Sequence, residues 1–262
     1  MKMIANYHTH TYRCRHAVGT EEEYIKKAIS EGVRVLGFSD HAPYIFEGSY
    51  SSYFRMKPDE QDGYFDTLIS LREKYRDKIK IHIGYEAEYY PELFGKTLKL
   101  WEKRAPEYLI LGQHVVGKEY VPELFIGATD YTESEERLRE YVDLVIGGIE
   151  TGCFTYVAHP DIINFHGDDE IYRREMTRLI LASKRRGMPL EFNLLGMSKK
   201  RNYPNDKFWT LAGELSCEAI LGCDAHDPER VADPCEIYEA LSYLDRRKIS
   251  VIDEIKLVNP FG

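Results

Sequence analysis

The residues that decide the fold read Val33-Arg34-Val35-Leu36-Gly37-Phe38-Ser39-Asp40-His41. The first part of this stretch, residues 33–38, is rich in the apolar and β-branched residues typical of a buried strand. It ends at once in polar side chains of the kinds that bind metal ions. The start of the chain repeats the pattern, since residues 3–7 form a β-favouring run that ends in His8. The pattern predicts strands with functional groups at their carboxyl ends.

Seven β-favouring runs along the chain end in this way. Their terminal polar residues are His8, His41, Glu86, His114, His159, Asn193 and Asp224. The first and the last of these lie 216 residues apart over six intervals, a mean of 36 residues per unit. This length fits a repeat of one strand and one helix, which takes roughly 30 residues or more.

Helical patterns separate the strands. The first begins at Thr20, where a threonine N-cap followed three residues later by Glu23 is a capping-box signature, and it ends near Gly32. Further helices are expected at residues 57–75, 92–103, 134–151, 170–186 and 207–216. Alternating strands and helices predict a parallel sheet with right-handed crossovers. Because seven carboxyl ends carry polar groups, we expect a closed α/β fold, a (βα)7 barrel, formed as a single domain over residues 1–262.

The composition limits the classes of function. The chain has 262 residues, with 35 lysines and arginines against 44 aspartates and glutamates, and a formal net charge of −9. This balance argues against nucleic acid as a partner, although a local basic cluster can still hold one phosphate group. No run approaches the ~20 apolar residues that would cross a membrane. Five cysteines without a Cys-x-x-Cys pair favour a cytoplasmic protein with free thiols. The sequence does not indicate an oligomeric state.

Two short motifs from opposite ends of the chain have the spacing of metal ligands. His8-Thr9-His10 puts two imidazoles on the same side of an extended chain, and Asp224-Ala225-His226 repeats the spacing. Glu86 adds a carboxylate whose two oxygens can bridge two cations. A mixed set of imidazoles and carboxylates without cysteine is typical of hydrolytic zinc, iron or manganese sites.

The other histidines divide by position. His41, His114 and His159 follow strand ends, where unrelated structural histidines would have no reason to gather. His82 lies inside a strand, and we expect it to pack there. The remaining two, His16 and His166, lie in loops on the expected active face, and His166 can reach a substrate from its position after His159.

Basic residues near strand ends are candidates for binding a phosphate group. Lys200 and Arg201 belong to the run Lys199-Lys200-Arg201 after Asn193, and Arg55 lies in the long loop after His41. A guanidinium can bind two phosphate oxygens at once, so Arg55 and Arg201 rank above the lysines. The alternative is that these residues form solvated basic loops.

Together the motifs resemble those of the polymerase-and-histidinol-phosphatase (PHP) superfamily. The motifs that carry the resemblance are His8-Thr9-His10, Asp40-His41, Glu86, His114, Ala158-His159-Pro160 and Asp224-Ala225-His226. Longer stretches, at residues 37–43, 84–91 and 191–193, resemble the histidinol-phosphatase branch of this superfamily.

The resemblance implies a distorted, TIM-like (βα)7 barrel of the PHP type that holds two to three divalent ions of zinc, iron or manganese. The ligands of the first ion would be His8, His10, Glu86 and Asp224. Those of the second would be Glu86, acting as a bridge, with His114 and His159. Those of the third would be His16, His41 and His226.

The resemblance also implies a phosphomonoesterase that hydrolyses L-histidinol phosphate to L-histidinol and phosphate in histidine biosynthesis. Bound metal ions lower the pKa of water and neutralise charge on phosphoryl oxygens, so such an enzyme needs no serine or cysteine nucleophile. Asp224, Glu86 and His226 are the expected catalytic residues. The alternative is a related phosphoesterase that acts on another small phosphate ester, such as a nucleotide. A non-enzymatic metal-binding module is the weaker hypothesis, because the ligand set looks complete.

Overall fold

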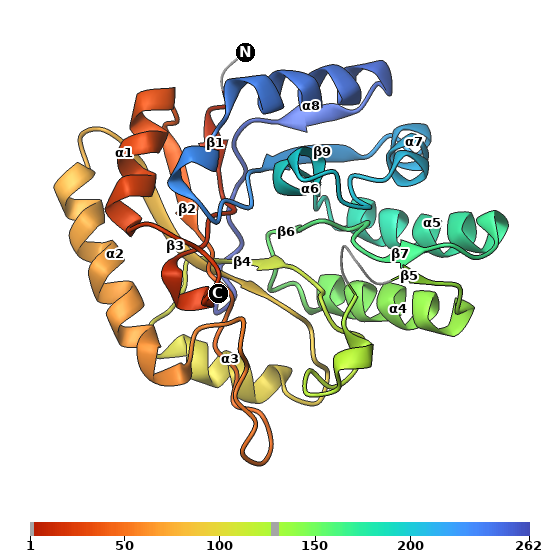
Figure 1. Cartoon of the computed structure of the whole chain (residues 1–262), viewed down its shortest axis with the longest axis horizontal. Coiled ribbons are helices and arrows are strands. Elements are labelled where there is room, and N and C mark those ends of the chain that lie inside the picture. Colours follow the sequence, from red (N-terminus) through yellow and green to blue (C-terminus); the bar gives the residue numbers. More distant parts are fainter. Residues whose placement is uncertain (1–2, 127–130) are drawn as a thin grey trace.

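A computed structural model describes residues 3–126 and 131–262 of the chain. The described residues contain a curled sheet of eight parallel strands with helices around its outside, as the TIM-like prediction required (Figure 1). Along the sheet the strands follow the order β1 (Ala5–Asn6), β2 (Val35–Phe38), β3 (Lys80–Ala87), β4 (Tyr108–Leu111), β6 (Tyr156–Val157), β8 (Leu190–Asn193), β9 (Glu218–Gly222) and β10 (Ser250–Ile252).

The two ends of the chain meet where the first and seventh expected strands finish. Thr9 and Ala225 form an isolated parallel bridge. The N–H of His10 donates to the Ala225 carbonyl at 3.0 Å, and the Ala225 N–H donates to the His8 carbonyl at 3.3 Å. Segments more than 200 residues apart in the sequence therefore present their side chains to one another at the carboxyl ends of the strands.

The expectation of seven strands is corrected to eight. The additional strand, β10, pairs with the first residues of β9, so that Ser250 lies opposite Glu218 and Ile252 opposite Ile220. β10 therefore lies beside the first residues of β9. The segment after β1 lies beside the chain that follows β9, because Thr9 pairs with Ala225. β10 is short and half-buried, and the two acids that follow it, Asp253 and Glu254, are exposed. This strand was not among the seven β-favouring runs singled out from the sequence.

The expected helices are all present, with ends within a few residues of the predictions. Thr20 caps the first helix in a complete capping box with Glu23, and Gly32 ends it with a φ of 84°, a conformation that favours glycine. Two further helices, α6 and α8, were not predicted. The helices are α1 (Glu21–Glu31), α2 (Gln61–Tyr75), α3 (Phe94–Glu102), α4 (Glu135–Thr151), α5 (Asp169–Arg185), α6 (Leu194–Ser198), α7 (Asp206–Glu214) and α8 (Pro234–Arg246).

Short elements complete the described chain. The strands β5 (Tyr131–Thr132) and β7 (Asn164–Phe165) form a small separate sheet beside the barrel. Single turns of 3-10 helix lie at η1 (Tyr12–Cys14), η2 (Pro58–Glu60), η3 (Pro122–Leu124) and η4 (Pro228–Arg230). The turn η1 lies in the first long loop, which carries His16 towards the carboxyl ends of the strands.

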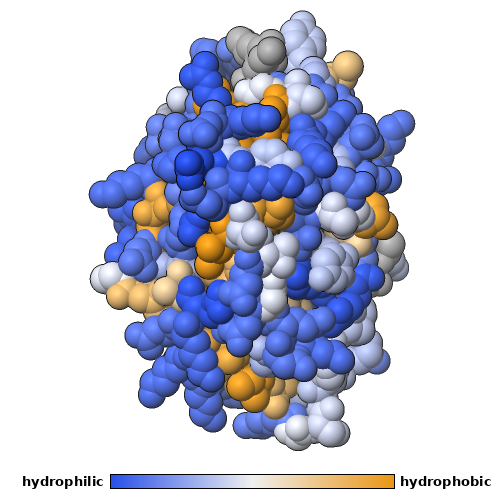
Figure 2. Space-filling view, turned by 90° about the vertical axis from the view of Figure 1, so that its left-hand side faces the viewer, coloured by the Kyte–Doolittle hydropathy of each residue, from blue (hydrophilic) through white to orange (hydrophobic). Residues whose placement is uncertain are grey.

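Burial follows from this layered arrangement. Every residue of β2 is buried, as expected for a parallel strand covered on both faces. In α1 the buried residues Tyr24, Ile25 and Ala28 recur at helical spacing on the face towards the sheet. The side of the molecule that carries α1 and α2 is mostly hydrophilic, with small separate apolar patches (Figure 2). Among the helices described, none is long and apolar enough to cross a bilayer.

Candidate metal centre

Glu86 lies at the centre of a buried cluster at the carboxyl ends of the strands. Its side chain is 1% exposed, and its two oxygens face different histidines. The oxygen Oε1 lies 2.8 Å from His159 Nε2 and 3.6 Å from His114 Nε2. The other oxygen, Oε2, faces His41 Nδ1 at 3.0 Å, His10 Nε2 at 3.5 Å and His8 Nε2 at 3.6 Å. A carboxylate that divides its oxygens between two sets of imidazoles has the geometry of a bridge between cations.

The paired motifs from the two ends of the chain converge beside Glu86. His8 Nε2 lies 3.1 Å from His10 Nε2. Asp224 Oδ1 lies 3.2 Å from His10 Nε2 and 3.5 Å from His8 Nε2. The bridge between Thr9 and Ala225 produces this convergence, because it aligns the two motifs side by side. The three ligand atoms lie close enough together to hold one cation.

His16, His41 and His226 form a second group, nearer the surface, whose nitrogens also converge. His16 Nδ1 donates to the Cys14 carbonyl at 2.7 Å, and His226 Nδ1 donates to the Asp224 carbonyl at 3.0 Å. Each bond leaves the Nε2 atom as the free acceptor of its ring, which is the tautomer that a metal ligand needs.

The cluster fits a set of divalent metal ions. Glu86 Oε2, His159 Nδ1 and His226 Nε2 are buried and have no hydrogen-bond partner among the described residues. Burying such atoms without a partner costs several kcal/mol in an apolar setting, of the order of 2–7, so a cation among them is the simplest compensation. The donor set of imidazoles and carboxylates suits transition metals in hydrolytic sites.

Cys14 is a further candidate ligand that the sequence analysis did not single out. It is fully buried, and its sulfur could share a cation with His10 and His226. Burial raises the pKa of the Cys14 thiol, and the Asp40 carboxylate raises it further. In the metal-free protein the thiol therefore stays protonated at neutral pH, and a cation bound there would have to displace its proton.

A second layer of polar groups holds the inner ligands in place. Glu191 is fully buried, and its Oε1 accepts from His8 Nδ1 at 2.7 Å. Its Oε2 accepts from the His159 backbone N–H at 2.9 Å and from Asn193 Nδ2 at 3.2 Å. Asn193 also donates to Asp224 Oδ2 at 3.1 Å. Asn193, predicted only as a strand end, and Glu191 therefore connect ligands from three strands.

Two glycines make room for the acids of the cluster. A Cβ atom on Gly112 would lie 2.0 Å from Glu86 Oε1, and one on Gly222 would lie 1.5 Å from Glu191 Oε1. Any side chain at these positions would displace the carboxylates. Neither glycine was predicted to have a role, because nothing in the local sequence pattern shows which side chain packs against it.

The inner and outer groups differ in their electrostatics. Burial by itself lowers the pKa of His8, but the carboxylates of Glu191, Asp224 and Glu86 outweigh it and raise this pKa to about 10. Burial and the neighbouring His10 instead hold the pKa of His226 well below its ordinary value and lower that of His16 as well. A negative field that favours a proton on His8 also favours a divalent cation, whereas the outer imidazoles are neutral at neutral pH.

A cavity of about 580 Å³ opens directly above the cluster. Glu86, His114, Asp224 and the three outer histidines form part of its lining. Three basic side chains also line it: Arg15, Lys199 and Arg201. Its apolar wall includes Tyr53, Phe54, Phe125, Ile126, Ile162 and Leu195. The cavity therefore combines acceptors of cations, donors for an anion and an apolar surface.

The predicted phosphate-binding residues are placed unequally. Arg201 lines the cavity, and its Nη1 donates to the Tyr203 hydroxyl at 2.6 Å. The neighbouring Lys199 lines it in place of the expected Lys200, since the chain leaves α6 at Lys199 and Lys200 has a positive φ of 53°. Arg15 was missed, although it directly precedes His16 in the loop that delivers that histidine.

Two other expected contacts do not fit the structure. Arg55 is 2% exposed and is held by Glu88 and Glu119 outside the cavity lining, so the expected contact of its guanidinium with phosphate is corrected. His166 is exposed on the small sheet, where its Nε2 lies 2.9 Å from Asn164 Oδ1, and it is not among the described residues that line the cavity. His82 lies in β3 and pairs with Glu107 at 2.5 Å, away from the cluster.

Comparison with known proteins supports the same interpretation. The family model described as PHP domain matches residues 6–194. A probable histidinol-phosphatase of Deinococcus radiodurans is 28% identical over 244 residues, which cover 88% of this chain and 89% of the relative. A probable histidinol-phosphatase of Schizosaccharomyces pombe is 27% identical, with 93% and 87% covered.

Solved structures share the fold at lower identity. The histidinol phosphate phosphatase of Lactococcus lactis, in complex with zinc, L-histidinol and phosphate, aligns with a TM-score of 0.74 at 18% identity over 97% of this chain and 99% of that one. A putative histidinol phosphatase from Listeria monocytogenes aligns with a TM-score of 0.72 at 22% identity, covering 89% and 99%. With the family model matched over most of its length, the chain belongs to the PHP domain family.

Proposed function

We propose that this protein is a metal-dependent phosphomonoesterase that hydrolyses L-histidinol phosphate to L-histidinol and phosphate. The observation that carries the proposal is the convergence of eight histidine and carboxylate side chains around the bridging position of Glu86, on the floor of a cavity with a basic rim. The probable histidinol-phosphatases among its relatives support this choice of substrate. A single domain over residues 1–262 and a cytoplasmic location belong to the same proposal.

The assignment of ligands follows the two groups of the cluster. His8, His10 and Asp224 would hold one ion, His114 and His159 a second, and Glu86 would bridge these two. His16, His41 and His226 would hold a third. Two to three ions of zinc, iron or manganese fit these donors. When bound, such ions supply a water of lowered pKa and neutralise charge on the phosphoryl group.

The protein's own residues then bind and orient the ester. Arg201, Lys199 and Arg15 donate to the phosphoryl oxygens that face the rim. Asp224 and Glu86 act as carboxylates that keep the floor negative: in both, the nearby imidazoles outweigh burial and hold the pKa well below its usual range. His226 lines the cavity together with His16 and His41, with which it would hold the outer ion.

The apolar wall accounts for the organic part of the substrate. Tyr53, Phe54 and Phe125 present aromatic surface to the cavity, which suits a flat ring such as imidazole. The same surface suits a nucleobase, so a nucleotide is the second candidate substrate.

The test is phosphate release by the purified, metal-loaded protein from L-histidinol phosphate and, in parallel, from nucleoside monophosphates. We expect a kcat/KM for L-histidinol phosphate well above that for any nucleotide, and no activity in a Glu86→Gln control. Preference for a nucleotide would favour the second candidate. Release from neither substrate, despite bound metal, would overturn the proposal.

A further inference from the structure

A buried network of charged side chains lies behind His114. Glu88, Arg55 and Glu119 are 0%, 2% and 2% exposed, respectively. Glu88 Oε1 accepts from His114 Nδ1 at 2.8 Å, and Glu88 Oε2 accepts from Arg55 Nη1 at 3.0 Å. One carboxylate therefore connects an imidazole of the metal cluster to a guanidinium in the protein interior.

The donors of Arg55 are directed away from the cavity. Nη1 also donates to the Ala42 carbonyl at 3.2 Å, and Nε donates to Glu119 Oε1 at 3.3 Å. Nη2 donates to the second oxygen of Glu119. The guanidinium also lies 4.3 Å from the centre of the Phe54 ring and 4.9 Å from that of Tyr44. Arg55 is therefore fixed on several sides and is not free to reach for phosphate.

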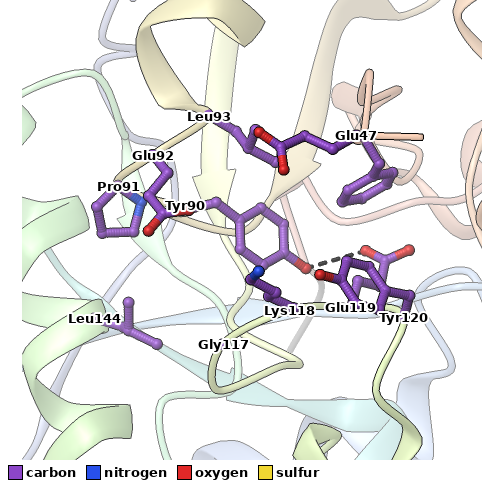
Figure 3. Close-up of a pocket in the computed structure, with 11 residues that line it drawn as sticks. Glu47, Tyr90, Pro91, Glu92, Leu93, Gly117, Lys118, Glu119, Tyr120 and Leu144 are labelled. Carbon is purple, nitrogen blue, oxygen red and sulfur yellow. Dashed lines mark hydrogen bonds between the residues drawn. The ribbon is translucent and has the colours of Figure 1, made fainter. Parts of the chain in front are cut away.

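The far end of the network meets a second pocket, of about 330 Å³ (Figure 3). The Tyr90 hydroxyl donates to Glu119 Oε2 at 3.0 Å in this pocket, as Figure 3 shows. The Tyr50 hydroxyl donates to Glu119 Oε1 at 3.2 Å. Both oxygens of Glu119 are thus held, and Glu119 in turn holds Arg55.

The charges of the network do not cancel. Two carboxylates face one guanidinium, which leaves one excess negative charge in the protein interior. Because a buried charge without compensation is costly, the network favours a positive charge near the remaining oxygen of Glu88. That oxygen faces His114, whose Nε2 lies 3.6 Å from Glu86 Oε1 in the metal cluster.

We propose that Glu88, held by Arg55, is a positioning residue that keeps the proton of His114 on Nδ1 and directs Nε2 to the ion shared with Glu86 and His159. Outer carboxylates of this kind fix the tautomer of a ligating histidine and increase its basicity. The inference rests on the proposed function in one respect, namely that a metal ion binds to His114. In place of the expected contact with phosphate, Arg55 has an indirect role: it holds Glu88, and Glu88 orients His114.

The test measures metal affinity separately from turnover. Glu88→Gln keeps the shape of the side chain but lacks its charge, and we expect a roughly tenfold to hundredfold weaker affinity for the ion at His114. The affinity is measured by competition of zinc with a chromophoric chelator. kcat should fall while KM changes little. Glu92→Gln, the same change at an exposed glutamate of the second pocket, is the matched control and should behave as wild type.

Variants of Arg55 distinguish positioning from phosphate binding. Arg55→Met should weaken zinc affinity as Glu88→Gln does, and Arg55→Lys should recover part of it, because an ammonium keeps the charge but not the two-sided geometry. If Arg55→Met does not fold, the double variant Arg55→Met/Glu119→Gln is used in its place. The double variant removes one charge of each sign, so the net charge of the network is unchanged.

Three results would overturn the inference. The first is wild-type zinc affinity in folded Glu88→Gln. The second is a raised KM with unchanged zinc affinity in the Arg55 variant, since this is what direct phosphate binding predicts. The third is a lower melting temperature of the metal-free variants without any change in zinc affinity, which would mark a purely structural role. Absence of turnover in the wild type would contradict the proposed function but would leave these affinity measurements valid.

Discussion

The inner and outer halves of the cluster are built from different chemistry. The inner half combines the carboxylates of Glu86 and Asp224 with imidazoles and is almost fully buried. The outer half consists of His16, His41 and His226 and contains no carboxylate of its own. His41 Nδ1 lies 3.0 Å from Glu86 Oε2, and His226 Nδ1 lies 3.3 Å from Asp224 Oδ1. His16 is exposed. Since carboxylates contribute charge and imidazoles do not, the inner ions should bind more tightly than the outer one.

This difference separates two tasks. On the proposed assignment, an inner pair of ions around Glu86 would compensate buried negative charge and would be hard to remove. On the same assignment, an outer ion held by His16, His41 and His226 would be easier to remove and would lie at the cavity.

Loss of the bridge should have the largest effect. Glu86→Gln removes the charge that faces five histidines, and we expect metal affinity to fall roughly a hundredfold to a few thousandfold, about the 3–5 kcal/mol of an uncompensated buried partner. At least two ions per chain should be lost under dialysis. Glu88→Gln should lose fewer, because it faces only His114. Elemental analysis of both variants checks the order, and equal losses would show that the bridge is misassigned.

A change one layer away should reproduce the effect in weaker form. Gly112→Ala puts a Cβ 2.0 Å from Glu86 Oε1, so the carboxylate has to move. We expect reduced inner metal content and reduced phosphate release. Gly95→Ala, a helical glycine with nothing within 4 Å of its Cβ, is the control. Full metal content in Gly112→Ala would mean that the position of Glu86 is not critical.

The two halves should differ in proton release on metal binding. His8, with a pKa raised to about 10, carries a proton at pH 7.5 in the metal-free protein, and an inner ion has to displace it. The pKa values of His16 and His226 are lowered, so an outer ion displaces no proton from them. Inner affinity should therefore rise with pH up to about 10, whereas outer affinity stays level. Titration calorimetry in buffers of different ionisation enthalpy measures this, and equal proton release in both steps would contradict the division.

The rim should affect the substrate and not the metals. Arg201→Ala removes a charged donor from the cavity, and we expect a loss of ~1.5–3 kcal/mol, roughly tenfold to more than a hundredfold in kcat/KM. Arg201→Lys should recover part of the loss. Steady-state kinetics with L-histidinol phosphate measures both, with metal content as the control. Unchanged kinetics in Arg201→Ala would favour the alternative, in which Arg201 belongs to a solvated basic loop and does not contact the substrate.

The sequence predicted those parts of the fold and site that repeat a pattern. Polar residues at strand ends located seven of the eight strands of the main sheet. The pattern missed β10 and the two short strands of the separate sheet, β5 and β7. The same pattern located the inner histidines and Glu86. No positioning role was predicted for Glu88. It lies two residues after Glu86 in an extended segment, so both side chains share a face, and the sequence offered it only as a rival to Glu86 for the ligand position.

The errors of prediction have a common physical origin. Arg55 and His166 lie in loops, where nearness in sequence to a strand end does not determine the direction of a side chain. Gly112 and Gly222 leave space for the carboxylates of Glu86 and Glu191 because they have no Cβ atom. The sequence does not show which side chain fills that space. Charge balance decided the place of Arg55, because two buried carboxylates require a partner.

Stepwise removal of metal from the loaded wild-type protein distinguishes the inner ions from the outer one. Elemental analysis at increasing chelator concentration should begin at two to three ions per chain. It should show one ion lost early, from the histidines His16, His41 and His226, and the others retained until much higher chelator concentration. At most one ion per fully loaded chain would contradict the account, and so would loss of all the ions in a single step.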